Sequence, residues 1–252
     1  MEFIKTQFDD GLMTVTLDRP PLNILNIAMM NEINEVLERC CLMQHLKVFL
    51  FNAEGKHFCA GVDIGEHMGD TAGNMIRAFH NMFKLLHKLE AITVASVHGN
   101  CLGGGMELAV FCDMVVAGTT AQFGQPEIKV GVFPPVAVQL LPRIIGMKPA
   151  IELILSGKTI DPHQCKSMGL VNVVTGDLIS TTKIFVKPYL DLSAAVIRLT
   201  KRAIREGLSV PGFGGSLKLI EELYLGPLMD THDANEGLTA FMEKRKPEWK
   251  NE

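Results

Sequence analysis

Two glutamates and a glycine run are the residues whose types and spacing could do chemistry. The stretch Gly99–Asp113 reads GNCLGGGMELAVFCD, with four glycines in seven residues and then Glu107 among apolar neighbours. Glu127 comes twenty positions later, in FGQPEIKVG. Each acid alone is more often a solvated surface group than a catalyst. Two carboxyl groups in one partly dry pocket would separate their pKa values, so that one could accept a proton and the other donate one.

The glycine run suits a developing negative charge. Without a Cβ, a ligand can approach the main chain, and a helix start adds partial positive charge. The spacing matches neither G-x-G-x-x-G nor a Walker loop, and a tight turn is the simpler interpretation. A second loop, KHFCAGVD at 56–63, follows the preceding strand. Two such loops can direct two N–H groups at one carbonyl oxygen, each worth about 2.7 to 4 kcal/mol, against about 0.3 to 1 kcal/mol for a helix terminus alone.

Alternating strands and helices must position these loops. Period-2 apolar spacing predicts strands and period-3.6 spacing predicts helices, and their alternation indicates an α/β core over residues 1–188. A helical part over residues 189–252 follows, where strand signals stop. The expected strands are 2–8, 12–17, 48–51, 92–97 and 114–117; the expected helices are 28–46, 76–89, one after Gly105, 193–206, 216–224 and 232–244.

The composition excludes several function classes. The 252 residues are 47% hydrophobic with a net charge of −4, which favours a folded protein without general affinity for nucleic acid or anionic lipid. No apolar stretch is long enough to cross a bilayer, and the N-terminus lacks a signal-peptide pattern, so we expect a cytoplasmic protein. The six cysteines contain no C-x-x-C pair and the eight histidines lack ligand spacing, so no metal site is expected. A Cys59–His57 nucleophile pair is disfavoured because side chains two apart on an extended segment face opposite ways.

Four stretches together resemble the enoyl-CoA hydratase/isomerase (crotonase) superfamily. They are HFCAGVDI, VHGNCLGGGMELAVFCDMVVA, AQFGQPEIKVG and GLTAFMEKRKPEW, in this order over essentially the whole chain. The resemblance implies a crotonase-like ββα superhelix with a helical C-terminal trimerisation region, assembled as a trimer or a dimer of trimers. It also implies an acyl-CoA thioester substrate and no cofactor, since CoA is part of the substrate.

The resemblance also implies roles for four residues. Carried over by position, the oxyanion-hole amides belong to Ala60 and Gly104, and the two catalytic glutamates are Glu107 and Glu127. In the implied reaction the two acids hold a water that adds to a conjugated C=C, while the two amides hold the enolate oxygen. Glu107 is expected to activate the water and Glu127 to move the proton to or from carbon.

One segment departs from the family pattern. Short-chain hydratases follow the second glutamate with P-G-x-G-G-T-x-R-L, whereas this chain has FPPVAVQLLPRI, which is stiffer and bulkier. This stretch and RPPLNILNIAMMNEI are similar to hydratases of cyclic dienoyl-CoA esters in anaerobic benzoyl-CoA degradation, so cyclohexa-1,5-diene-1-carbonyl-CoA is the leading expected substrate. The alternatives are a linear short-chain 2-enoyl-CoA hydratase and a non-catalytic acyl-CoA-binding module.

Overall fold

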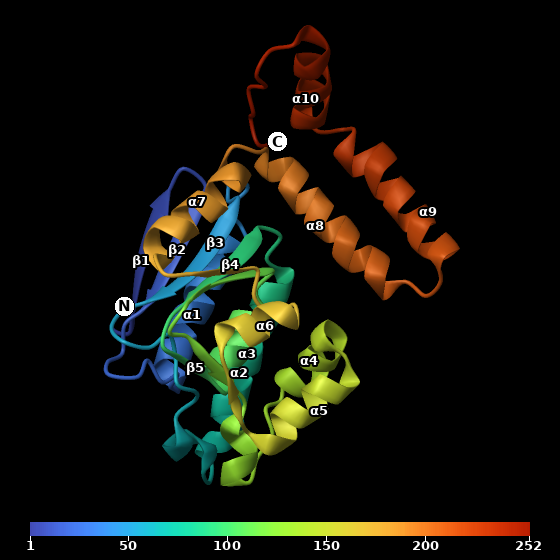
Figure 1. The fold of residues 1–252 in the computed structure, drawn as a ribbon. Helices are drawn as coiled ribbons and strands as arrows, with labels where there is room; N and C mark the ends of the chain where they lie inside the picture. The colour runs from blue at the N-terminus through green and yellow to red at the C-terminus, as the bar shows by residue number, and fades with distance from the viewer.

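A computed structural model describes all residues 1–252 and contains two sheets flanked by helices (Figure 1). The larger sheet has the strand order β1-β2-β3-β4-β6-β9 and the smaller one β5-β7-β8. The strands are β1 Ile4–Asp9, β2 Leu12–Leu17, β3 Val48–Ala53, β4 Ile92–Val97, β5 Asn100–Leu102, β6 Met114–Gly118, β7 Gln122–Gly124, β8 Thr159–Ile160 and β9 Val173–Thr175. The helices are α1 Ile27–Cys40, α2 Thr71–Lys88, α3 Gly104–Phe111, α4 Ala137–Ile145, α5 Met147–Ser156, α6 Pro162–Ser167, α7 Leu178–Leu190, α8 Ala194–Ser209, α9 Phe213–Leu223 and α10 His232–Glu243.

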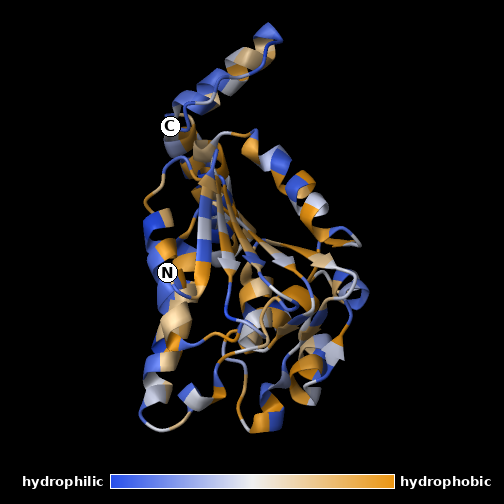
Figure 2. Ribbon diagram, turned by 90° about the vertical axis from the view of Figure 1, so that its left-hand side faces the viewer, coloured by the Kyte–Doolittle hydropathy of each residue, from blue (hydrophilic) through white to orange (hydrophobic).

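The central strands of the larger sheet are buried on both faces, whereas the edge strand β1 is largely exposed. Strands β1 and β2 form the expected antiparallel hairpin, and the remaining neighbours in this sheet pair in parallel. In β3, Phe49 and Phe51 belong to the main core with α1 and α2, whereas Val48 and Leu50 pack toward α7. This explains the continuous apolar run VFLF, because a strand covered on both sides needs no alternation. The strands accordingly form an apolar centre between helices of mixed hydropathy (Figure 2).

In the larger sheet, β2, β3, β4 and β6 are each followed by a short extended segment and then a helical segment. After β4 the chain forms β5 and α3, and after β6 it forms β7. The corresponding segments after β2 and β3 are not full strands. They form only single β-bridges, which pair Leu25 with Val62 and Cys59 with Cys101. The second layer therefore runs through four segments in spatial order: 22–25, 58–62, β5 and β7. This layer carries the turns from which α2 and α3 start, and it was not expected from the sequence.

Helix α1 ends earlier than expected. The prediction extended to residue 46, but α1 ends at Cys40 because the chain must turn back to enter β3. The turn is closed by short-range bonds from Leu42 N to Arg39 O (3.1 Å) and from Met43 N to Cys40 O (3.1 Å). The apolar residues in this turn continue the helical spacing, so the sequence pattern does not reveal the stop.

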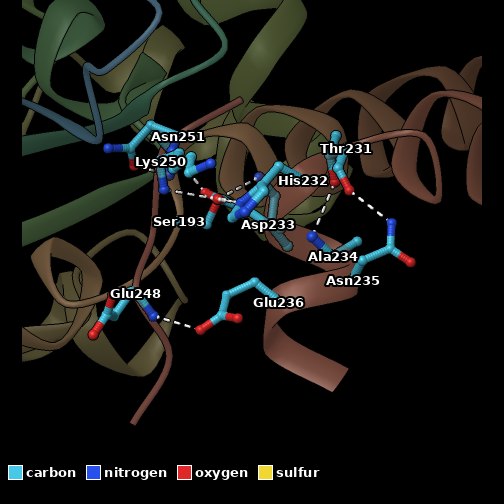
Figure 3. Close-up of polar contacts among 12 residues, drawn as sticks. Ser193, Thr231, His232, Asp233, Ala234, Asn235, Glu236, Glu248, Lys250 and Asn251 are labelled. Atoms are coloured by element: carbon cyan, nitrogen blue, oxygen red, sulfur yellow. Dashed lines mark hydrogen bonds and ion pairs between the residues drawn. The ribbon is translucent and has the colours of Figure 1, made fainter. Parts of the chain in front are cut away.

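The C-terminal helices leave the sheet. Helix α7 still covers the sheet, so the expected boundary at 188 falls within the last turn of α7, whereas α8 and α9 form an arm that projects from it (Figure 1). Ser193 caps α8, as expected, and its hydroxyl donates to the buried Asp233 Oδ2 at 2.5 Å. Asp233 also accepts bonds from the backbone amides of Lys250 and Asn251, both at 2.8 Å. These bonds fold the C-terminal tail back onto α10 (Figure 3). None of the helices combines the length and apolar character needed to cross a membrane.

Candidate active site

Glu107 is the most deeply buried acid of the site. It lies in the first turn of α3, as expected, and its exposed fraction is 1%. Its Oε1 accepts two backbone hydrogen bonds, from Val136 N at 2.7 Å and from Ala137 N at 2.8 Å. Its Oε2 accepts no hydrogen bond from the protein and yet is not fully enclosed. One oxygen of Glu107 is therefore anchored, and the other is open to a water or a ligand.

The surroundings keep Glu107 protonated to an unusually high pH. Burial raises its pKa from 4.5 to about 8, because the charged form loses solvation. The amides of Ala137 and Val136 act in the opposite direction, and the nearby charge of Glu127 adds to the rise. A carboxyl group with a pKa near the operating pH is suited to general acid–base work.

Glu127 lies beside the same glycine turn. It sits in the 3₁₀ turn Pro126–Val130 that follows β7, and burial raises its pKa from 4.5 to about 7. A Cβ built on Gly103 would lie 2.6 Å from Glu127 Oε1. Oriented with its amide nitrogen toward the acid, as the network requires, the buried Gln125 donates to Oε1 and Oε2 of Glu127 at 3.2 and 3.1 Å. The fold thus brings the two predicted acids together, one on α3 and one against the turn that starts it.

At each glycine of the run, other parts of the protein occupy the space where a Cβ would stand. At Gly104, a Cβ would lie 2.5 Å from Val62 Cγ2 and 3.1 Å from the ring of Phe79. At Gly105 it would collide with the carbonyl oxygen of Cys59. Gly103 has a positive φ of 54° in addition to its contact with Glu127. Three neighbouring segments therefore approach the start of α3 so closely that no side chain fits, which explains the glycine requirement.

The amide of Gly104 is available, but the amide of Ala60 is not. Gly104 is the first residue of α3, and its N–H has no acceptor in the protein. The Ala60 N–H instead donates to Leu22 O at 3.0 Å, contrary to the expected role of Ala60 as an oxyanion donor. Two residues later, Val62 has an N–H without an acceptor and a side chain beside Gly104. The free amide of this loop is therefore that of Val62, not of Ala60.

Backbone direction explains this difference. The carbonyl of Gly61 and the N–H of Asp63 both bond to Leu25, each at 2.9 Å. In an extended segment, alternate residues direct their N–H and C=O groups to opposite sides. Val62 lies between these two residues, so its N–H points away from Leu25, on the side of the α3 start. An extended motif predicts that N–H groups alternate in direction. It does not show which of them pair with the neighbouring segment and which stay free.

Cysteine and histidine do not form a reactive pair here. His57 Nδ1 accepts the N–H of Asn100 at 3.0 Å, whereas Cys59 Sγ lies against Gly61 O at 3.4 Å. Burial raises the pKa of the Cys59 thiol to about 12, so the reactive thiolate is scarce. All six cysteines are free, and no group of three His, Cys, Asp or Glu side chains is arranged to hold a metal. A separate surface cavity lined by Cys41, Lys88 and Arg198 contains none of the predicted site residues.

Known proteins with similar sequences cover nearly the whole chain. A family profile described as "Enoyl-CoA hydratase/isomerase" matches residues 7–252. The chain is 37% identical over 244 residues to the cyclohexa-1,5-dienecarbonyl-CoA hydratase of Thauera aromatica, covering 96% of this chain and 94% of that one. It is 35% identical over 242 residues to the short-chain-enoyl-CoA hydratase of Clostridium acetobutylicum, covering 93% and 92%.

The fold comparison gives the same result. A crystal structure of an enoyl-CoA hydratase from Bacillus anthracis superimposes with a TM-score of 0.93 at 28% identity, covering 100% of both chains. The expected crotonase-like fold is therefore confirmed. The chain belongs to the enoyl-CoA hydratase/isomerase family and is a hydro-lyase of the enoyl-CoA hydratase type.

Proposed function

We propose that this protein adds water to a conjugated C=C of an acyl-CoA thioester, and that its substrate is cyclohexa-1,5-diene-1-carbonyl-CoA. The observation that carries the reaction is the pair of acids at the glycine turn, the buried Glu107 and the half-buried Glu127, with pKa values raised to about 8 and about 7. Because both pKa values lie near neutrality, the pair can hold one proton and pass it between water and carbon.

In the proposed mechanism, Glu107 and Glu127 hold one water between them. With the shared proton on Glu127, the ionised Glu107, anchored through Oε1, takes a proton from the water through Oε2, and the water oxygen bonds to the conjugated carbon. The π electrons move to the thioester oxygen, which becomes an enolate held by the N–H groups of Gly104 and Val62. Glu127 then delivers a proton to carbon as the enolate collapses. The acids share one proton, so they can exchange these roles in the reverse reaction.

The substrate assignment is supported by the loop that holds Glu107. Val136 and Ala137, whose amides anchor Oε1, belong to FPPVA, the segment that departs from the glycine-rich pattern of linear short-chain hydratases. Pro134 and Pro135 precede these amides and have no N–H of their own. A stiff loop holds the acid in one place and suits a rigid ring better than a flexible chain. The name of the Thauera aromatica relative agrees with this assignment.

A linear short-chain enoyl-CoA is the second candidate substrate, since the Clostridium acetobutylicum relative carries that name. Product identification after incubation with cyclohexa-1,5-diene-1-carbonyl-CoA and crotonyl-CoA, in parallel, separates the two. We expect a larger kcat/KM for the cyclic ester. Much faster hydration of crotonyl-CoA would refute the ring assignment. The non-catalytic binding module loses support, because the relatives named above are hydratases.

We also propose that the protein assembles as a trimer or a dimer of trimers through its helical C-terminal region. The arm formed by α8 and α9 exposes large apolar side chains, with 86% of Leu208 and 81% of Phe213 exposed. Apolar residues gathered on a projecting arm are typical of a surface covered by another chain. Light scattering coupled to size-exclusion chromatography should give a mass of three or six chains, and a monomer would refute the proposal.

A further inference from the structure

The loop that presents the Val62 amide is held by the segment before α1. Leu22 O accepts the N–H of Ala60 at 3.0 Å, and Leu25 exchanges bonds with Gly61 and Asp63, each at 2.9 Å. Residues 22–25 therefore lie along one edge of residues 60–63 like a neighbouring strand. On the opposite edge, residues 58 and 59 of the same loop pair with His98 and with β5. The position of the loop is thus set by both edges.

Asn23 fixes the beginning of this loop. It is 1% exposed, and its side-chain nitrogen donates to Glu54 O at 2.9 Å and to His57 O at 2.8 Å. Neither carbonyl accepts any other hydrogen bond in the protein. The side-chain oxygen of Asn23 accepts the N–H of Arg19 at 2.8 Å. The backbone of Asn23 has a φ of 51°, a conformation that asparagine tolerates better than most residues.

We propose that Asn23 is a positioning residue for hydration: it holds the loop 54–63 so that the Val62 N–H meets the same oxygen as the Gly104 N–H. This inference rests on the proposed function. Without the two donated bonds, the carbonyls of residues 54 and 57 seek other partners and the loop shifts along its neighbour. An oxyanion donor acts only over a narrow range of distances, and a shift of about 1 Å costs about a hundredfold in rate.

Two variants of Asn23 test the proposal. Asn23→Asp keeps the size of the side chain but replaces the donating nitrogen by oxygen. Asn23→Gly keeps the positive φ and removes the side chain, so it remains informative if the aspartate variant does not fold. The matched control is Asn26→Ala in the same segment. Asn26 caps α1 by accepting the N–H of Met29 at 2.9 Å, so its loss lowers stability without touching the loop.

The readouts are kcat, KM and the carbonyl stretching band of a bound thioester, ¹³C-labelled at the carbonyl and saturated so that it does not react. Polarisation by the two amides lowers the frequency of this band relative to that of the thioester free in solution. This decrease is the band shift. We expect the Asn23 variants to lose about tenfold to a hundredfold in kcat with KM nearly unchanged, and to show a smaller band shift than wild type. We expect the Asn26 variant to have a lower Tm than wild type but the same kcat and the same band shift.

Two results would overturn the inference, one for Asn23 alone and one for the proposed function as a whole. If the folded Asn23 variants match Asn26→Ala in kcat and in the carbonyl band, Asn23 acts only on stability. If wild-type protein shows no band shift and hydrates no thioester, the proposed function itself fails and this inference fails with it. A band shift lost in the Asn23 variants and kept in the control supports the positioning role.

Discussion

Replacing Glu107 by Gln should make the protein less active but more stable. Glutamine can keep the anchored oxygen, which accepts the amides of Val136 and Ala137, but it cannot exchange a proton. General acid–base catalysis contributes about 10² to 10⁴-fold, so kcat should fall at least about a hundredfold.

The stability change follows from the pKa of Glu107, which rises from 4.5 to about 8 on folding. Between these two values the folded protein keeps a proton that the unfolded chain has released, so folding loses stability as the pH rises. At about 1.4 kcal/mol per pKa unit, the loss is about 3 kcal/mol at pH 7 and levels off at about 5 kcal/mol above pH 8. Glu107→Gln removes this titration, so its advantage over wild type should grow with pH through this window.

Urea unfolding of both proteins at one protein concentration, from pH 5 to pH 8, measures this difference. We expect the free energy of unfolding of Glu107→Gln, relative to wild type, to increase by about 4 kcal/mol across the series. Glu127 titrates in both proteins but is coupled to Glu107 in wild type only, so the comparison measures the titration of the pair against that of Glu127 alone. A difference that stays constant with pH, or a variant that keeps wild-type kcat, would refute the reasoning that Glu107 is a buried acid with a catalytic proton.

Three further substitutions test other parts of the structure. Gly103→Ala places a Cβ 2.6 Å from Glu127 Oε1 at a positive φ, so kcat should fall at least about tenfold in steady-state assays; unchanged kcat would contradict the close approach. Lys201→Met removes the ion pair to Asp113 Oδ2 (2.6 Å) that ties α8 to the core, and should cost about 2 kcal/mol in urea unfolding, whereas an unaltered midpoint would show that the pair contributes nothing. Asp233→Asn weakens acceptance of the two tail amides, and hydrogen exchange at residues 250 and 251 should accelerate; equal protection would indicate that other contacts hold the tail.

The elements with a regular apolar period could be predicted from the sequence. The β1–β2 hairpin, the buried run of β3 and the start of α3 follow from residue types alone. The placement of Glu107 in the first turn of α3 was likewise predictable, because a glycine run and an apolar helix define that turn. These features depend on local periodicity and turn chemistry, which a single sequence contains.

The second layer of extended segments could not be predicted in the same way. Strands β5 and β7 have three residues each, and the pairs Leu25–Val62 and Cys59–Cys101 are single bridges, too short for any period to emerge. The choice between Ala60 and Val62 depends on this layer, because only pairing with Leu25 decides which amide is consumed and which is left. The identity of the two acids does not depend on this pairing. Which backbone amide stays free does depend on the register of the neighbouring segment.

A crystal structure with bound cyclohexanecarbonyl-CoA, a saturated and unreactive thioester, tests the central claim most directly. The account predicts the thioester oxygen about 3 Å from the amide nitrogens of both Val62 and Gly104, with one water in contact with Glu107 Oε2 and Glu127. A thioester oxygen bound away from these amides, or carboxyl groups that share no water beside the acyl group, would contradict it.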